Sequence, residues 1–138
     1  IRNTYFYATE EHFNTAFKRS VAHGSNVILM QKSDLKSSIQ YMAQALRAGK
    51  NLMIFPEGRR TNTGEMGDFK KTFAILAKEL RVPIVPVRIT GAFEALPRHK
   101  SFPRPSKVTV EYLPAVMPDV TKSYDEIAEQ VKKIIARD

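Results

Sequence analysis

Apolar residues along this chain form short unbroken runs that alternate with runs spaced three or four residues apart. The unbroken runs predict strands at residues 5–8, 26–30, 51–55 and 84–90, and an alternating run predicts a half-exposed strand at 107–113. The spaced runs predict helices across residues 10–22, 35–46, 69–80 and 124–135. Asp34 and Gly49 are residue types that begin and end such a helix. Strands that are apolar on both faces and alternate with helices indicate an α/β fold, with a mostly parallel sheet flanked by helices.

The length of the chain fits one domain. Its 138 residues, of which 43% are hydrophobic, are enough to form one core. No internal repeat, low-complexity tract or linker divides them, so we expect a single domain over residues 1–138. The first residue is Ile1 rather than Met, and we therefore expect the chain to come from a longer protein.

Composition narrows the chemistry. The chain contains no cysteine, which excludes disulfides, thiolate nucleophiles and cysteine zinc sites, and a cytoplasmic setting is the expectation. No run approaches the roughly 20 apolar residues that cross a bilayer, so any membrane contact is expected to be peripheral. The formal net charge of +8 attracts phosphates of lipids, nucleic acids or nucleotides, or belongs to a solvated surface without a partner.

Residues 56–68 follow a predicted buried strand and are rich in glycine, threonine and charge, which predicts a loop. Ligands of open α/β sheets lie beyond the carboxyl ends of strands. Gly58 permits a close approach of the backbone, while Arg59 and Arg60 offer planar N–H donors that suit phosphate oxygens. Glu57 can accept from a hydroxyl or hold an arginine. The alternative is an ordinary solvated turn, in which such a pair contributes about 0–1 kcal/mol.

The loop sequence Phe-Pro-Glu-Gly-Arg-Arg-Thr, at residues 55–61, resembles a known motif. It is similar to the third motif, Phe-Pro-Glu-Gly-Thr-Arg-Ser, of the PlsC-like glycerol-phosphate and lysophosphatidate acyltransferases. Arg60 takes the place of the motif's arginine, Thr61 that of its serine, and Arg59 replaces its threonine. With the Thr-Asn-Thr-Gly stretch that follows, Arg59 is closer to the acyltransferase segments joined to acyl-carrier-protein synthetases.

Three further stretches follow the family's order. Residues 82–87, Val-Pro-Ile-Val-Pro-Val, are similar to its fourth motif, and Pro86 there requires an edge position, a bulge or a functional reason. Phe-Lys at residues 69–70 occurs where the family commonly has it. Residues 26–32 are a degenerate counterpart of the second motif, with Lys32 in place of its arginine, or simply a core strand. The resemblance covers residues 5–118 and implies an incomplete acyltransferase fold.

The family's first motif, His-x-x-x-x-Asp, is missing. In the family its histidine removes the proton of the acceptor hydroxyl, and its aspartate orients the imidazole. The residues five positions after the three histidines are Phe17 after His12, Ile28 after His23 and Arg104 after His99. We therefore assign no catalytic residue here and expect the pair before Ile1. The chain is then the C-terminal part of an acyltransferase domain and inactive alone, or a homologue that has lost its chemistry.

The resemblance implies transfer of a fatty acyl group from acyl-CoA or acyl carrier protein (acyl-ACP) to a lysophospholipid or glycerol-phosphate acceptor, at the cytoplasmic face of a membrane and without a cofactor or metal. Arg60, Arg59 and Lys32 would hold the phosphate, with Glu57 near the glycerol hydroxyls. The predicted substrate-binding residues are Glu57, Gly58, Arg59, Arg60, Thr61, Lys32 and Pro86.

The basic segment 98–107, which contains Phe102, is predicted to meet anionic lipid headgroups or an acidic carrier protein, unless it is merely solvated. A nonenzymatic phosphate- or lipid-binding module remains the alternative to an enzyme. Nucleic-acid binding is not supported, because zinc spacing, recognition motifs and stacking aromatics are missing from the sequence. The sequence also contains no Gly-x-Ser-x-Gly elbow of a hydrolase.

Overall fold

The computed structural model describes residues 4–9, 27–30, 35–98, 100 and 102–137. Its chain forms two compact units, residues 1–55 and residues 56–138. Whether both units belong to one domain stays a prediction. The helix expected at 10–22, the N-cap Asp34, the histidines His12, His23 and His99, and Lys32 all lie outside the described residues.

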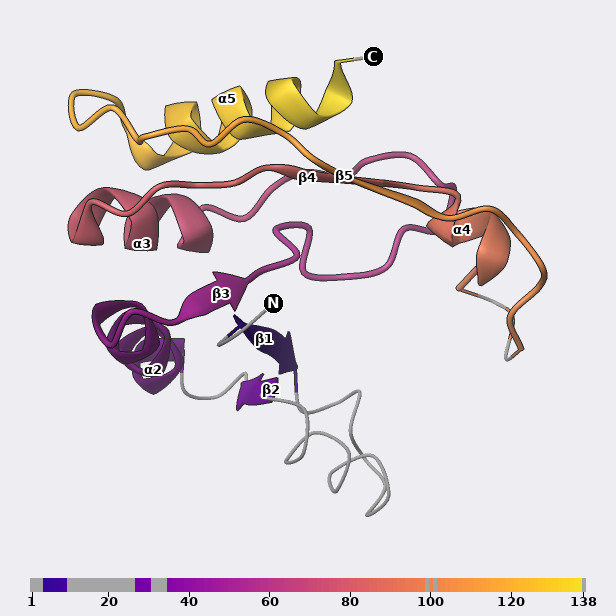
Figure 1. The fold of residues 1–138 in the computed structure, drawn as a ribbon, viewed down its shortest axis with the longest axis horizontal. Coiled ribbons are helices and arrows are strands. Elements are labelled where there is room, and N and C mark those ends of the chain that lie inside the picture. Colours follow the sequence, from indigo (N-terminus) through magenta and orange to yellow (C-terminus); the bar gives the residue numbers. More distant parts are fainter. Residues whose placement is uncertain (1–3, 10–26, 31–34, 99, 101, 138) are drawn as a thin grey trace. The chain divides into compact units, whose positions relative to one another are not determined.

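The first unit contains a three-stranded parallel sheet and one helix. Its strands are β1 (Thr4–Thr9), β2 (Val27–Met30) and β3 (Asn51–Met53), in the order β2-β1-β3 (Figure 1). Parallel neighbours require crossover connections, and α2 (Leu35–Arg47) lies between β2 and β3 in sequence and contacts β3. Met42 of α2 is fully buried. The three strands and the helix predicted here are confirmed.

Gly49 ends α2 as its residue type predicts. Its φ of 71° lies in the left-handed region, where glycine meets no penalty. The Gly49 N–H donates to the Leu46 carbonyl and the Lys50 N–H donates to the Ala45 carbonyl, each at 3.0 Å. These are the two hydrogen bonds of a Schellman motif, and they satisfy carbonyl groups that the helix end would otherwise leave without partners.

The second unit is built around two helices that pack on each other, α3 (Thr72–Leu80) and α5 (Tyr124–Ala136). Ala74 of α3 meets Ile127 and Ala128 of α5, and all three are buried. Partly buried Phe69, Phe73, Ile84 and Tyr124 surround this contact. The small alanines let the helices approach closely, and the core of this unit lies between them.

The amino end of α5 is closed by a capping box. The Ser123 hydroxyl accepts from the Glu126 N–H at 3.2 Å, and the Glu126 carboxylate accepts from the Ser123 N–H at 2.7 Å. These bonds hold the pKa of Glu126 below its ordinary value, because they favour the charged carboxylate. Ser-x-x-Glu before an apolar run is a sequence signal that fits the helix predicted here.

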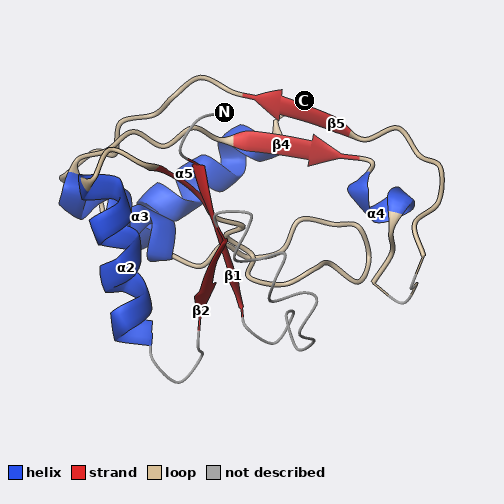
Figure 2. Cartoon of the chain, turned by 60° about the horizontal axis from the view of Figure 1, so that its bottom comes forward, coloured by secondary structure: helices blue, strands red, loops and turns tan. Residues whose placement is uncertain are grey.

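Strands β4 (Val87–Thr90) and β5 (Thr109–Tyr112) pair in opposite directions as a separate two-stranded sheet (Figure 2). Arg88 donates to the Ile135 carbonyl of α5 at 2.7 Å and pairs with Glu111 at 3.3 Å. All four residues of β5 are exposed, so the prediction that this strand is half-exposed is wrong. Alternation along a strand shows two faces, but it does not show which of them the rest of the fold covers.

The predicted ends of several elements differ from the observed ones. The helix expected from residue 69 begins at Thr72, and Phe69 instead packs edge-on against Phe73, with ring centroids 6.3 Å apart. The strand expected at 84–90 is shortened to β4, although Ile84 still bridges Val116. The single helical turn α4 (Ala92–Ala95) was not predicted, since four residues contain too little periodicity to read.

Candidate functional site

Residues 56–70 form the predicted loop, which is closed on itself by two hydrogen bonds. The Glu57 carboxylate accepts from the Gly67 N–H at 2.8 Å, and the Lys70 N–H donates to the Pro56 carbonyl at 2.8 Å. An added Cβ at Gly67 would lie 3.1 Å from the Glu57 carboxylate oxygen, so glycine provides the room for this contact. A charge-assisted bond across ten residues holds the loop shut.

Gly58 lies at the tip of this closure with a φ of 66°. An added Cβ there would come within 2.7 Å of the Lys70 ammonium nitrogen and within 2.9 Å of its Cε. The Lys70 side chain therefore lies directly against the Gly58 backbone. The glycine thus provides the close approach expected from the sequence, together with a left-handed backbone.

Hydrogen bonds link the loop to the segment that follows α4. The Arg60 guanidinium donates to the Leu96 carbonyl, and Arg98 donates to the Asn62 side chain at 3.2 Å. The Thr61 hydroxyl accepts from two N–H groups of the turn at 3.1 and 3.2 Å. Two arginines, one from each segment, therefore hold the motif loop beside residues 96–98.

A hollow of about 380 Å³ opens on the inner side of the loop. Its walls are made by seven neighbouring residues: Glu57, Gly58, Arg59, Gly67, Asp68, Phe69 and Lys70. Two carboxylates and two cations therefore face one small surface site.

The Asp68 carboxylate pairs with the Lys132 ammonium of α5 at 2.9 Å. This contact lowers the pKa of Asp68, with a smaller contribution from the charge of Arg59, and it raises the pKa of Lys132. Asp68 is fully exposed, so the pair is a solvated one whose contribution to folding is small. Locally, the pair gives the Asp68 carboxylate of the hollow a cationic partner from α5.

The cations of the hollow differ from its acids. Within the described part of the chain, neither the Arg59 guanidinium nor the Lys70 ammonium has a hydrogen-bond or ion-pair partner, whereas Glu57 and Asp68 both do. With Lys132 included, three cations face two carboxylates here, which is an excess of one positive charge. Such an arrangement is suited to binding an anion at the surface.

The predicted site residues are brought together only in part. Glu57, Gly58 and Arg59 line the hollow, but Arg60 and Thr61 do not. Pro86 is buried immediately before β4, and its carbonyl accepts from the Leu113 N–H at 2.9 Å. The register of β4 and β5 puts Pro86 opposite Leu113, so its missing N–H removes the reciprocal bond and the ladder ends there. The role of these residues in substrate binding stays a prediction.

Sequence reasoning missed Lys70 and Lys132. Lys70 had a signal, since it belongs to the Phe-Lys pair that resembles the family, but nothing in the sequence places its ammonium against Gly58. The sequence contains no signal for Lys132, because a lysine on the last helix is indistinguishable from other solvated lysines. Its contact with Asp68 spans 64 positions and depends on how α5 packs.

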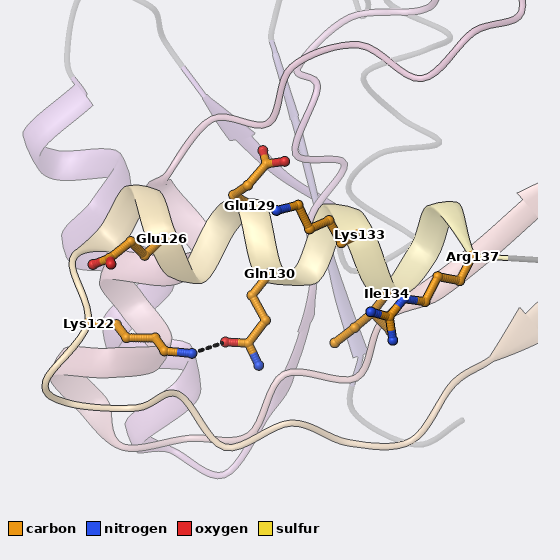
Figure 3. A pocket seen from close by; sticks show the side chains of 7 residues that line it. All are labelled: Lys122, Glu126, Glu129, Gln130, Lys133, Ile134 and Arg137. Atoms are coloured by element: carbon orange, nitrogen blue, oxygen red, sulfur yellow. Dashed lines mark hydrogen bonds between the residues drawn. The ribbon is translucent and has the colours of Figure 1, made fainter.

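A second hollow, of about 550 Å³, lies along α5 (Figure 3). Lys122 reaches across it to the Gln130 side chain at 3.1 Å. Its lining residues are Lys122, Glu126, Glu129, Gln130, Lys133, Ile134 and Arg137. Most of these residues belong to a single helix, whereas the motif loop lines the smaller hollow, so we place the candidate site there.

Two absences concern only the residues that the structure describes. None of their helices is long and apolar enough to span a bilayer. Among the same residues, no group of histidine, aspartate and glutamate side chains is arranged to hold a metal ion.

The comparisons with known proteins point to one family. The acyltransferase family model matches residues 1–90, which include the loop described above. The 1-acyl-sn-glycerol-3-phosphate acyltransferase of Limnanthes alba is 36% identical over 111 residues, which cover 78% of this chain and 39% of the relative. The protein of the same name from Cocos nucifera is 39% identical over 83 residues, covering 59% and 27%. This chain thus spans less than half the length of these relatives.

A solved structure has the same fold. The crystal structure of the 1-acyl-sn-glycerophosphate (LPA) acyltransferase PlsC from Thermotoga maritima superposes with a TM-score of 0.82. The match covers 98% of this chain and 55% of that chain at 24% sequence identity, so it shows the fold and confirms the predicted α/β class. Together with the family match over residues 1–90, it leads to one conclusion: the chain belongs to the acyltransferase family.

Proposed function

We propose that this chain is the acceptor-binding part of an enzyme that transfers a fatty acyl group from acyl-CoA or acyl carrier protein to a lysophospholipid or glycerol phosphate. Because no histidine of this sequence has an aspartate five positions on, the base and its orienting carboxylate come from residues outside it. That histidine removes the proton of the acceptor hydroxyl, whose oxygen attacks the acyl thioester. The ester forms as the carbon–sulfur bond breaks, and the proton passes from the histidine to the departing thiol.

The observation that carries the proposal is the closed motif loop inside the family match. Glu57 and Gly67 hold the loop shut, and Arg59 and Arg60 follow directly after Gly58. A guanidinium has five N–H groups, so the one that Arg60 gives to the Leu96 carbonyl orients the side chain and leaves others for phosphate oxygens. Lys32 and Pro86 complete the proposed binding set.

The test compares Arg60→Ala with Arg47→Ala in the full natural protein. Arg47 is an exposed arginine at the end of α2 and provides the same loss of charge outside the loop sequence 56–70. We expect Arg60→Ala to raise the KM for a lysophosphatidate acceptor about tenfold or more and to leave the KM for the acyl donor unchanged. A folded Arg60→Ala protein with an unaltered acceptor KM would contradict the role.

We also propose that the basic segment 98–107 meets an anionic membrane. Phe102 there is 83% exposed, and charged residues flank it on both sides. Each cation near such a surface contributes about 1 kcal/mol, and the attraction weakens as salt increases. Liposomes with increasing phosphatidylserine content should therefore bind the chain more tightly at low salt. Liposome binding that changes neither with the anionic lipid content nor with the salt concentration would exclude this contact.

A nonenzymatic phosphate- or lipid-binding module is the other reading of the same loop. It predicts acceptor binding without turnover, even by the full natural protein supplied with acyl-CoA and acyl carrier protein thioesters. Release of the free thiol at a rate that depends on the acceptor would exclude it.

A further inference from the structure

We propose that Lys70 is a phosphate-binding residue, which shares the hollow of the loop with Arg59 and holds the acceptor's phosphate against Gly58. This role rests on the proposed function, because it identifies the phosphate of that acceptor as the ligand. It adds to the loop's two arginines a cation thirteen positions beyond the motif glutamate.

The first argument is the pairing of charges in the hollow. Of its two acids, Glu57 is bound to the Gly67 N–H at 2.8 Å, and Asp68 is bound to Lys132 at 2.9 Å. In the described part of the chain, neither acid forms an ion pair with the hollow's own cations. An anion that enters meets two cations without an ion-pair partner, beside one carboxylate that Lys132 neutralises and a second, Glu57, that keeps its charge.

The second argument is the position of the Lys70 ammonium. It lies where a Cβ of residue 58 would come within 2.7 Å, so the glycine leaves its backbone open beside the cation. The Lys70 backbone is itself fixed, since its N–H donates to the Pro56 carbonyl at 2.8 Å. A phosphate seated here can reach the ammonium from one wall and the Arg59 guanidinium from another.

The third argument concerns size and chemistry. A space of about 380 Å³ is ample for a phosphate group with part of its alcohol, and its walls contain mainly polar and charged groups. A compact ammonium acts as a point charge, whereas the guanidinium provides directed donors. Together they suit a phosphomonoester dianion better than a single arginine does.

The neighbouring lysine offers a matched control. Lys71 is exposed like Lys70, but its ammonium pairs with Asp125 of α5 at 3.2 Å and does not line the hollow. Lys71→Met removes the same charge one position away. An exposed pair of this kind contributes little to folding, so both methionine variants should fold.

In the experiment, the full chain is titrated with glycerol 3-phosphate, inorganic phosphate or glycerol, and calorimetry measures the binding. We expect Lys70→Met to weaken binding of both phosphates about tenfold and Lys71→Met to leave it unchanged. Lys70→Arg should recover most of the affinity, because it restores the charge. Glycerol should not bind measurably in this assay. Thermal unfolding of each variant separates lost binding from lost structure.

The outcomes separate this inference from the proposed function. A folded Lys70→Met chain that binds glycerol 3-phosphate as the parent does, or a parent chain that binds neither phosphate, overturns the role of Lys70. Binding that depends on Lys70, in a natural protein that never transfers an acyl group, supports the subsite and removes the proposed function. If the natural protein transfers acyl groups and Lys70→Met leaves the acceptor KM unchanged, the proposed function is supported and the role of Lys70 is excluded.

Discussion

Substituting Gly58 by alanine tests whether the loop needs its glycine for shape, for space or for both. With a φ of 66°, a residue other than glycine is destabilised there by about 1–2 kcal/mol. The methyl group would also come within 2.7 Å of the Lys70 ammonium nitrogen. That atom is the end of a flexible side chain, so it can swing away at little cost to folding. We therefore expect Gly58→Ala to lower the stability by the backbone term alone and to lower the phosphate affinity strongly.

Gly49→Ala is the matched control for the backbone term. Gly49 has a similar φ of 71°, but no atom lies within 4 Å of its added Cβ. Urea unfolding should give both variants losses of about 1–2 kcal/mol. Calorimetric titration with glycerol 3-phosphate should show about a tenfold loss for Gly58→Ala and none for Gly49→Ala. Equal phosphate affinity in the two folded variants would refute the reasoning that places the Lys70 ammonium at the binding surface.

Three further changes test the packing of the second unit. Arg81 ends α3 with a φ of 51°, a left-handed conformation that glycine adopts without penalty. Arg81→Gly should stabilise the chain by about 0.5 kcal/mol in urea unfolding, because the relief of the left-handed conformation exceeds the cost of glycine's added flexibility. A loss of stability would contradict this. Ser123→Ala should cost about 1 kcal/mol through the lost cap, and Ser123→Thr should recover most of it in the same assay. The pKa of Asp68 lies below its ordinary 3.8, so its pair with Lys132 contributes above pH 3.8, and this contribution is lost as pH falls through the lowered value. Asp68→Asn should therefore lower the urea midpoint at pH 7 but not in strong acid, and a deficit independent of pH would count against the pair.

The elements that could be predicted from the sequence are those with local signals. The Ser123 capping box, the glycine after α2 and the apolar spacing of α2 and α5 each act within a few residues, and the structure has all three. The strands β1, β2 and β3 are short apolar runs next to turn residues, and α2 provides the connection between β2 and β3 that parallel strands require. Local chemistry therefore decides where these elements lie.

What could not be predicted depends on distant contacts. The exposure of β5 follows from what packs on its two faces, and alternation along the strand contains no information on that. The Arg60 contact with Leu96 spans 36 positions, and the Lys132 contact with Asp68 spans 64. The motif indicated which residues belong to the loop, but it could not show which of its cations would be engaged elsewhere in the fold.

Glu57 shows how one motif residue can satisfy two demands. The resemblance assigned its carboxylate to glycerol hydroxyls, whereas the structure has one of its oxygens accepting from the Gly67 N–H. A carboxylate has two oxygens and about four acceptor positions, so closing the loop through one oxygen leaves the other for a hydroxyl. The bond to Gly67 also fixes the direction of that second oxygen, because the carboxylate can no longer rotate freely. Under the proposed function, loop closure and acceptor recognition depend on the same carboxylate, and we expect an alanine at this position to remove both together.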